Sequence, residues 1–242
     1  MRTAGGRIWT GTDGGVYVYS PREDAFAAFD LLSDKQTRVT GYVTCIAGEG
    51  EEVWIASEGQ GLFCHDCRTG ALRHLFQTQG LPNVNTFLLT EDSCWVALYA
   101  DNLYAVSKAF DSDMRPFRDA EGREPFKGDV VNMITPGPHN CVYVASNAGL
   151  TEINLTTRKT RRLLDAYVRT ARLGADGELW VGTETGLYVL SLPDGRTRAR
   201  LTVPEQDDPY ALPDNAIYSL CRDREGGMWI GSYFGGGCPK TC

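Results

Sequence analysis

Six times along this chain a five-residue stretch recurs with an aromatic residue at its second position and Gly or Ala at its fourth, as in IWTGT from Ile8 and LWVGT from Leu179. The aromatic residues follow one another at intervals of about 40–50 residues, the length of one supersecondary unit in many repeat proteins. The aromatic residues are Trp9, Trp54, Trp95, Tyr143, Trp180 and Trp229, and the small residues are Gly11, Ala56, Ala97, Ala145, Gly182 and Gly231.

Each period reads as four strands joined by tight turns. An apolar segment such as VNTFLL from Val84 precedes the aromatic strand, and two further segments follow it, as at Gly186 and Thr197. Gly, Asn and Asp gather between these segments, as hairpin loops require. No stretch repeats at 3.6 residues, which excludes helical solenoids. The sequence therefore predicts an all-β fold, a β-propeller of four-stranded antiparallel blades.

The repeated column has a physical role in such a fold. Blades pack face to face, so we expect the aromatic ring to fill the space between neighbouring sheets. We expect the Gly or Ala to let the backbone of the next blade approach closely.

We predict one propeller segment over residues 1–242, an incomplete arc of about five to six blades. We expect the first unit to lack its innermost strand and the sixth to end after its second strand, where YFGGGCPKTC begins. A closed five-blade ring, in which residues 217–222 complete the first blade, stays open as an alternative. The predicted blades span residues 7–31, 42–76, 83–118, 129–164, 167–203 and 216–232.

Composition narrows the function classes. The chain has 24 basic and 31 acidic residues and a formal charge of −7, which disfavours nucleic acid as a partner. No apolar run approaches the roughly 20 residues of a membrane helix, so we expect no membrane contact within this segment. The first residues lack the apolar core of a secretory signal, so we expect no export signal in this sequence.

Three stretches carry a family resemblance: GGRIWTGTDGGVYVY, GELWVGTETGLYVL and ALPDNAIYSLCRDREGGMWIGSYFGG. They resemble the two-component regulator propeller repeats, which build the periplasmic sensor regions of hybrid two-component histidine kinases. The resemblance implies a periplasmic, non-catalytic segment that senses a small molecule or an oligosaccharide. The kinase and membrane segments of that family have no counterpart in this sequence.

Other patterns are weaker. Cys64–Cys67 (CHDC) invites a metal or redox interpretation, but a zinc site needs four ligands, and Cys64 fits a strand with Cys67 in the following turn. DREGGMW at Asp223 and GADGELW resemble Asp-box turns, in which the carboxylate binds the turn backbone. A sialidase would need an arginine cluster, for which Arg38, Arg123 and Arg172 are the candidates. We therefore predict no catalytic residue, no metal and no cofactor.

Departures from the repeat template are the best candidates for ligand contacts. Tyr99 and Asp101 enter the third unit after Leu98 replaces the usual hydroxyl residue, and Tyr233 and Phe234 enter the sixth. The insertion at 118–129 is another departure. Aromatic faces with carboxylates suit sugar recognition. Two alternatives stay open: a propeller lyase or glycoside hydrolase, and a protein-interaction scaffold that forms a homodimer.

Overall fold

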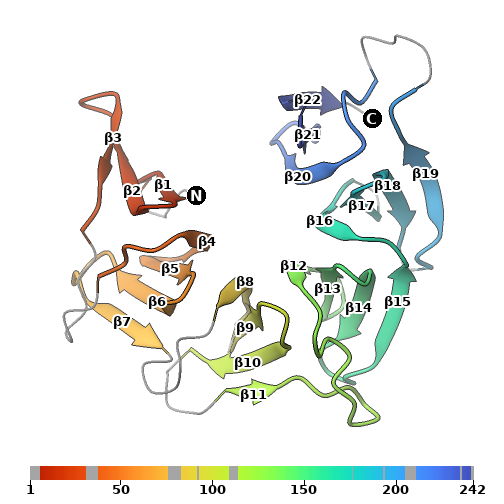
Figure 1. Cartoon of the computed structure of the whole chain (residues 1–242), viewed down its shortest axis with the longest axis horizontal. Coiled ribbons are helices and arrows are strands. Elements are labelled where there is room, and N and C mark those ends of the chain that lie inside the picture. The colour runs from red at the N-terminus through yellow and green to blue at the C-terminus, as the bar shows by residue number, and fades with distance from the viewer. Residues whose placement is uncertain are drawn as a thin grey trace. The chain divides into compact units, whose positions relative to one another are not determined.

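The computed structural model describes residues 6–30, 38–75, 83–91, 93–108, 114–175, 177–192, 194–204, 211–234 and 236–240. Every regular element in these residues is a β-strand, and consecutive strands form antiparallel sheets (Figure 1). The predicted all-β class is confirmed. Across the same residues, no helix has the length and apolar character that a membrane crossing would need.

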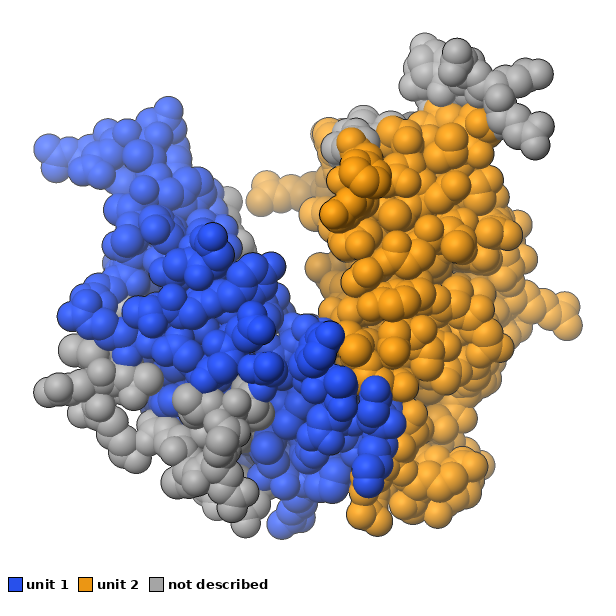
Figure 2. Space-filling view, viewed as in Figure 1, with its two compact units in different colours: residues 1–117, 126–128 blue, residues 118–125, 129–242 orange. Residues whose placement is uncertain are grey.

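The chain divides into two compact units, which Figure 2 colours separately. Unit 1 comprises residues 1–117 and 126–128, and its described part holds three sheets. They are β1 (Trp9–Thr12), β2 (Gly15–Ser20) and β3 (Ala25–Ala28); β4 (Val43–Glu49), β5 (Glu52–Ser57), β6 (Gly61–Asp66) and β7 (Leu72–Leu75); and β8 (Val84–Leu89), β9 (Ser93–Leu98), β10 (Leu103–Ser107) and β11 (Arg115–Pro116).

Unit 2 comprises residues 118–125 and 129–242, and its described part also holds three sheets. They are β12 (Val131–Pro136), β13 (Cys141–Ser146), β14 (Leu150–Asn154) and β15 (Thr160–Leu164); β16 (Val168–Leu173), β17 (Glu178–Thr183), β18 (Gly186–Ser191) and β19 (Thr197–Leu201); and β20 (Ile217–Arg222), β21 (Met228–Ser232) and β22 (Gly236–Lys240). The prediction of one propeller segment over 1–242 stays a prediction, as do the blade number and ring closure.

The last strand corrects one expectation. We expected the sixth blade to stop after its second strand, but β22 pairs with β21 from Ser232↔Gly236 to Met228↔Lys240. Pairing with a preceding strand needs only backbone groups, so a segment without the usual apolar pattern can still form a strand. β21 therefore has a hydrogen-bonded partner on each side, since β20 pairs with it as well.

The fifth position of the repeated stretch closes the turn after it. Thr183 donates a hydrogen bond through Oγ1 to the Gly186 carbonyl over 2.8 Å, and its Oγ1 accepts one from the Thr185 backbone N–H over 3.0 Å. Gly186 has a φ of +134°, and the Leu201 carbonyl oxygen would lie 2.7 Å from a Cβ at this position. A hydroxyl followed three residues later by glycine is thus a local requirement of this hairpin.

Sheets in each unit stack face to face, and the aromatic column lies in the stack. Trp9 and Trp54 are buried in unit 1, as are Tyr143 and Trp180 in unit 2. Trp180 packs with Leu187 of its own sheet and with the third sheet of unit 2, including Ile217. The packing role predicted for the aromatic residues is confirmed at these four positions.

Two members of the column differ. Trp95 is half-buried and packs edge-on against Phe117, with ring centroids 5.6 Å apart. Trp229 is 47% exposed, and its indole donates a hydrogen bond to Asp223 Oδ2 over 3.0 Å. The expectation that every ring is wedged between sheets is therefore wrong at Trp229.

Candidate functional site

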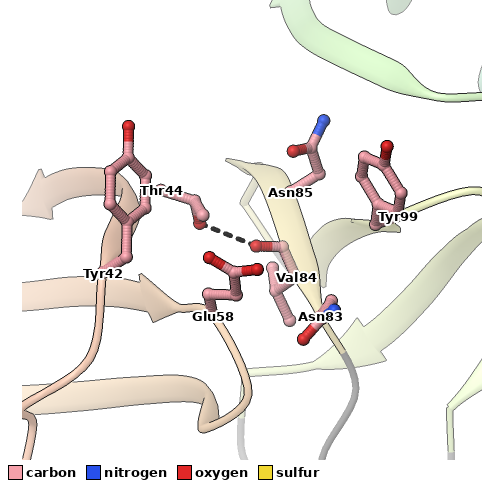
Figure 3. Close-up of a pocket in the computed structure, with 7 residues that line it drawn as sticks. All are labelled: Tyr42, Thr44, Glu58, Asn83, Val84, Asn85 and Tyr99. Carbon is pink, nitrogen blue, oxygen red and sulfur yellow. Dashed lines mark hydrogen bonds between the residues drawn. The ribbon is translucent and has the colours of Figure 1, made fainter. Parts of the chain in front are cut away.

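The second and third sheets of unit 1 enclose a cleft of about 370 Å³. Its walls come from the loops at one end of these sheets and from the first residues of β4 and β8 (Figure 3). The lining residues are Tyr42, Thr44, Glu58, Asn83, Val84, Asn85 and Tyr99.

Backbone hydrogen bonds hold these loops in place. The Glu58 N–H donates to the Tyr42 carbonyl over 2.8 Å, and the Tyr99 N–H donates to the Asn83 carbonyl over 2.8 Å. Each bond joins the loop before the first strand of a sheet to the loop after its second strand. The Gly59 N–H also donates to Asn83 Oδ1 over 2.9 Å, which ties the loop of one sheet to the next sheet. The site is therefore built on two sheets that hydrogen bonds hold together.

A β-bulge places one side chain of each sheet in the cleft. Pairing of β4 with β5 shifts between Val43 and Cys45, and pairing of β8 with β9 shifts between Val84 and Thr86. The pairing skips Thr44 in β4 and Asn85 in β8. A bulge redirects the side chain of the residue that it leaves unpaired, and both side chains line the cleft. Thr44 Oγ1 donates to the Val84 carbonyl over 2.7 Å, and this bond crosses between the sheets in Figure 3.

The open groups of the cleft are aromatic and polar. Tyr42 is 55% exposed and Tyr99 is 58% exposed, and they stand on opposite sides of the cleft with Glu58 between them (Figure 3). The two phenol hydroxyls and the Glu58 carboxylate make no hydrogen bond to any residue that the structure describes. Two rings, a carboxylate and amide groups can stack against a ligand and accept or donate hydrogen bonds.

The two ligand contacts predicted in the third blade, Tyr99 and Asp101, have different surroundings in the structure. Tyr99 lines the cleft. Asp101 does not: its Oδ2 accepts a hydrogen bond from the Tyr104 hydroxyl over 2.8 Å, and its carbonyl accepts one from the Gly128 N–H. Asp101 thus holds the loop that carries Tyr99. No ligand is present to test either residue, so both stay predictions as ligand contacts.

The ligand contacts predicted in the sixth blade, Tyr233 and Phe234, form an exposed aromatic group in unit 2. Tyr233 is 60% exposed and Phe234 is 86% exposed. Their ring centroids lie 4.5 Å apart, and Tyr233 also lies 5.2 Å from Tyr218. These residues, too, stay predictions as ligand contacts.

Sequence reasoning missed Tyr42, Glu58 and the two bulge residues of the cleft. One signal for Glu58 was available: it directly follows the stretch VWIAS, as Tyr99 follows CWVAL and Tyr233 follows MWIGS. Comparing this sixth position across the repeats would have placed Glu58 beside Tyr99 as a candidate.

The other candidate chemistry has local structural partners. Arg38 pairs with Asp30 and Arg123 pairs with Asp119, while Arg172 Nε donates to the Leu220 carbonyl. Asp119 organises the insertion at 118–129 by accepting hydrogen bonds from the Glu121 and Arg123 N–H groups. Burial opposes its ionisation, but the Arg123 hydrogen bonds lower the pKa of Asp119 below its ordinary value.

The CHDC cysteines lie as the sequence predicted. Cys64 is buried in β6 and Cys67 lies in the following turn. Burial raises the pKa of the Cys64 thiol to about 12. No group of three or more His, Cys, Asp or Glu residues in the described part of the chain could hold a metal ion.

One of the two predicted Asp turns can be followed. Asp223 Oδ1 accepts hydrogen bonds from the Glu225 N–H over 3.0 Å and from the Gly227 N–H over 2.7 Å. The expected structural role of this carboxylate is confirmed. In GADGELW the corresponding Asp176 lies outside the described residues.

The segment that contains this turn decides the comparison with known families. Residues 211–234 match the two component regulator propeller. The resemblance seen in the sequence is confirmed for this segment. Within the two component regulator propeller match, Asp214 accepts hydrogen bonds from the Ala216 and Phe234 N–H groups, so the motif residues join the two loops at one end of the third sheet of unit 2.

Solved structures establish the fold. The extracellular domain of the hybrid two component system BT3049 from B. thetaiotaomicron superposes with a TM-score of 0.78 and 20% identity, over 96% of this chain and 31% of that one. The Cps50 (Swd1) beta-propeller domain of Myceliophteria thermophila gives 0.63 and 14%, over 94% and 77%. Virginiamycin B lyase from Staphylococcus aureus gives 0.71 and 12%, over 95% and 75%.

These similarities confirm the predicted β-propeller fold of four-stranded antiparallel blades. The chain spans about a third of the length of the BT3049 extracellular domain. No curated protein matches the sequence.

Proposed function

We propose that this chain is a ligand-recognising propeller segment of an extracytoplasmic, periplasmic sensor in a two-component system. It binds its ligand without catalysis, and the ligand is an oligosaccharide. The cleft of unit 1 is the recognition site.

Two findings support the sensor role. The two component regulator propeller match lies in unit 2, and the fold is shared with the extracellular domain of a hybrid two component system. Because the chain spans about a third of that domain, the proposal assigns recognition to this chain and signalling output to other parts of the sensor.

The arrangement of Tyr42, Tyr99 and Glu58 carries the oligosaccharide assignment. Two exposed rings face the cleft from opposite sides, and a carboxylate without a protein partner among the described residues lies between them (Figure 3). Sugar rings stack on aromatic faces through their C–H surfaces, and their hydroxyls donate to carboxylates and amides. Asn83 and Asn85 supply amide groups at the same cleft.

Isothermal titration of the whole chain against a panel of neutral, acidic and amino oligosaccharides tests the proposal. We expect one class to bind, and Tyr42→Ala and Tyr99→Ala each to weaken binding about tenfold, because each removes one aromatic face from the cleft; tenfold corresponds to about 1.4 kcal/mol. Phe26→Ala is the matched control, because Phe26 is 51% exposed on β3 and does not line the cleft. A flat titration across the panel would contradict the proposal.

Two further measurements separate the alternatives. Chromatography of each incubated oligosaccharide should return the input, whereas new products would indicate a lyase or hydrolase. Light scattering of the ligand-free chain should give the mass of a monomer, whereas a stable homodimer would favour the protein-interaction scaffold.

A further inference from the structure

The repeats give each unit an equivalent of the same site. Tyr167 precedes β16 as Tyr42 precedes β4, and Glu184 follows β17 as Glu58 follows β5. The Glu184 N–H donates to the Tyr167 carbonyl over 3.3 Å, in the same way that the Glu58 N–H donates to Tyr42. The second and third sheets of unit 1 and of unit 2 therefore build the same tyrosine–glutamate frame.

The bulge residue distinguishes the two frames. In unit 2 the pairing of β16 shifts between Val168 and Thr170, so Arg169 takes the position that Thr44 has in unit 1. Its guanidinium carbon lies 4.4 Å from the Tyr167 ring centroid and 4.6 Å from the Tyr218 ring centroid. Arg169 also forms an ion pair with Glu184. The frame of unit 2 thus holds a cation that its own chain supplies.

The frame of unit 1 keeps the tyrosine and the glutamate and lacks the cation, and Asn85 takes the position that Tyr218 has in unit 2. Thr44 is too short to reach Glu58 in the way that Arg169 reaches Glu184, and its hydroxyl is used on the Val84 carbonyl. The Glu58 carboxylate has no ion pair with any described residue, and Tyr42 remains 55% exposed beside it. The remaining space is the cleft of about 370 Å³.

We propose that the cleft of unit 1 binds a positively charged group of its ligand, held between Glu58 and the faces of Tyr42 and Tyr99. This rests on the proposed function in one respect: the ligand is taken to be an oligosaccharide, so the charged group is the ammonium of an amino sugar. A cation gains from an aromatic face within about 6 Å and from a charge-assisted bond to a carboxylate. Arg169 shows that this frame accepts both contacts at once.

A matched pair of ligands tests the charge. Isothermal titration compares a glucosamine tetramer with its N-acetylated counterpart, which has the same backbone and no positive charge. We expect the glucosamine tetramer to bind at least about tenfold more tightly, and Glu58→Gln to remove most of this difference. Equal binding of both tetramers, unchanged in Glu58→Gln, overturns the cation inference and leaves the oligosaccharide proposal standing.

A non-sugar probe separates the two proposals. N-acetylarginine amide carries a guanidinium and no sugar. If it binds in a Glu58-dependent way while no oligosaccharide does, the cation site is supported and the oligosaccharide proposal fails. If neither the probe nor the glucosamine tetramer binds, both are overturned.

A substitution at Thr44 tests the structural argument. Thr44→Arg supplies a cation from the chain, as Arg169 does in unit 2, and we expect it to abolish binding of the glucosamine tetramer. Thr44→Met is the control, because it adds similar bulk without charge and should weaken binding less. Circular dichroism and urea unfolding confirm that both variants fold. If Thr44→Arg binds the tetramer as tightly as Thr44→Met does, the proposed equivalence of the two frames is wrong.

Discussion

Thr44 Oγ1 lies 2.7 Å from the carbonyl oxygen of Val84 and donates a hydrogen bond to it across two sheets of unit 1. The equivalent bulge residue of β12, Asn132, donates through Nδ2 to the Val168 carbonyl over 2.8 Å in unit 2. Each bond joins the bulge of one sheet to the first strand of the next. The bulge therefore has two consequences, a tie between sheets and a side chain directed to the end of the strands where the loops lie.

Thr44→Val should lower the free energy of unfolding by about 1 kcal/mol, the net contribution of one intramolecular hydrogen bond. Valine keeps the shape and the β-branch and removes the donor. Urea unfolding followed by tryptophan fluorescence measures the change. Thr197→Val on β19 is the control, because Thr197 is exposed and its side chain makes no hydrogen bond to another sheet among the described residues, and its effect should stay within about 0.5 kcal/mol. Equal effects of the two substitutions would contradict the role given to Thr44.

Gly182→Ala should destabilise unit 2 by about 1–3 kcal/mol, because it overpacks a close contact between sheets. A Cβ at this position would lie 2.7 Å from Ile217 Cγ2 and 2.9 Å from the Ile217 carbonyl oxygen in the neighbouring sheet. Gly14→Ala is the control, since the nearest atom to its Cβ would be Thr12 Oγ1 at 4.0 Å. Thermal unfolding of both variants measures the difference. A neutral Gly182→Ala would show that the sheets can move apart at no cost.

The repeated column made the fold predictable, because its requirement is the same in every blade. Gly182 illustrates this: Ile217 of the neighbouring sheet and Thr170 leave no room for a Cβ, and the fourth position of each repeated stretch is Gly or Ala. The hydroxyl at the fifth position is equally readable, since at Thr183 it closes the hairpin that follows. Requirements that recur in each unit can be read from one sequence.

The cleft was only partly predictable, because its residues differ from blade to blade. Tyr99 was recognised as a departure from the template, but Glu58 looked ordinary beside it. Thr44 and Asn85 were hidden because a bulge adds one residue to a strand, which shifts the alternation of inward and outward side chains. Placement of a bulge depends on pairing with the next strand, and a strand's own sequence does not reveal it.

The two indoles of unit 2 should differ in their contribution to stability. Trp180 is 3% exposed and Trp229 is 47% exposed. Trp180→Ala should cost about 3–5 kcal/mol through loss of buried surface and the cavity left behind, whereas Trp229→Ala should cost roughly 1 kcal/mol. Urea unfolding followed by circular dichroism measures both variants. Similar losses would show that Trp229 is covered in solution by a surface that this chain does not supply.

Acid should destabilise the protein below about pH 4, because several turn aspartates have lowered pKa values in the folded state. At Asp214 the cause is hydrogen bonds from the Ala216 and Phe234 N–H groups, which favour the ionised carboxylate. The other aspartates with lowered pKa values are Asp66, Asp119, Asp194 and Asp223.

As the pH falls, the unfolded chain takes up protons first, at its ordinary aspartate pKa of about 3.9. The stabilisation from these groups is therefore complete well above this value and is lost as the pH falls through the lower folded values. The urea midpoint should be level from about pH 5 to 7 and decline toward pH 3, and Asp214→Asn should reduce that decline. A midpoint that rises on acidification would contradict the assignment.

Native thiol reactivity should separate the buried cysteines Cys64 and Cys94 from the exposed Cys221. Burial raises the pKa of Cys64 to about 12 and raises the pKa of Cys94 still further, so both are protonated and unreactive at pH 8. Cys221 is exposed on β20 and should react with iodoacetamide before these two, as peptide mapping by mass spectrometry would show. The same reaction in urea should label all three, which controls for intrinsic reactivity. Rapid native labelling of Cys64 would instead favour a redox role for the pair Cys64 and Cys67, because only an accessible thiolate could attack the reagent.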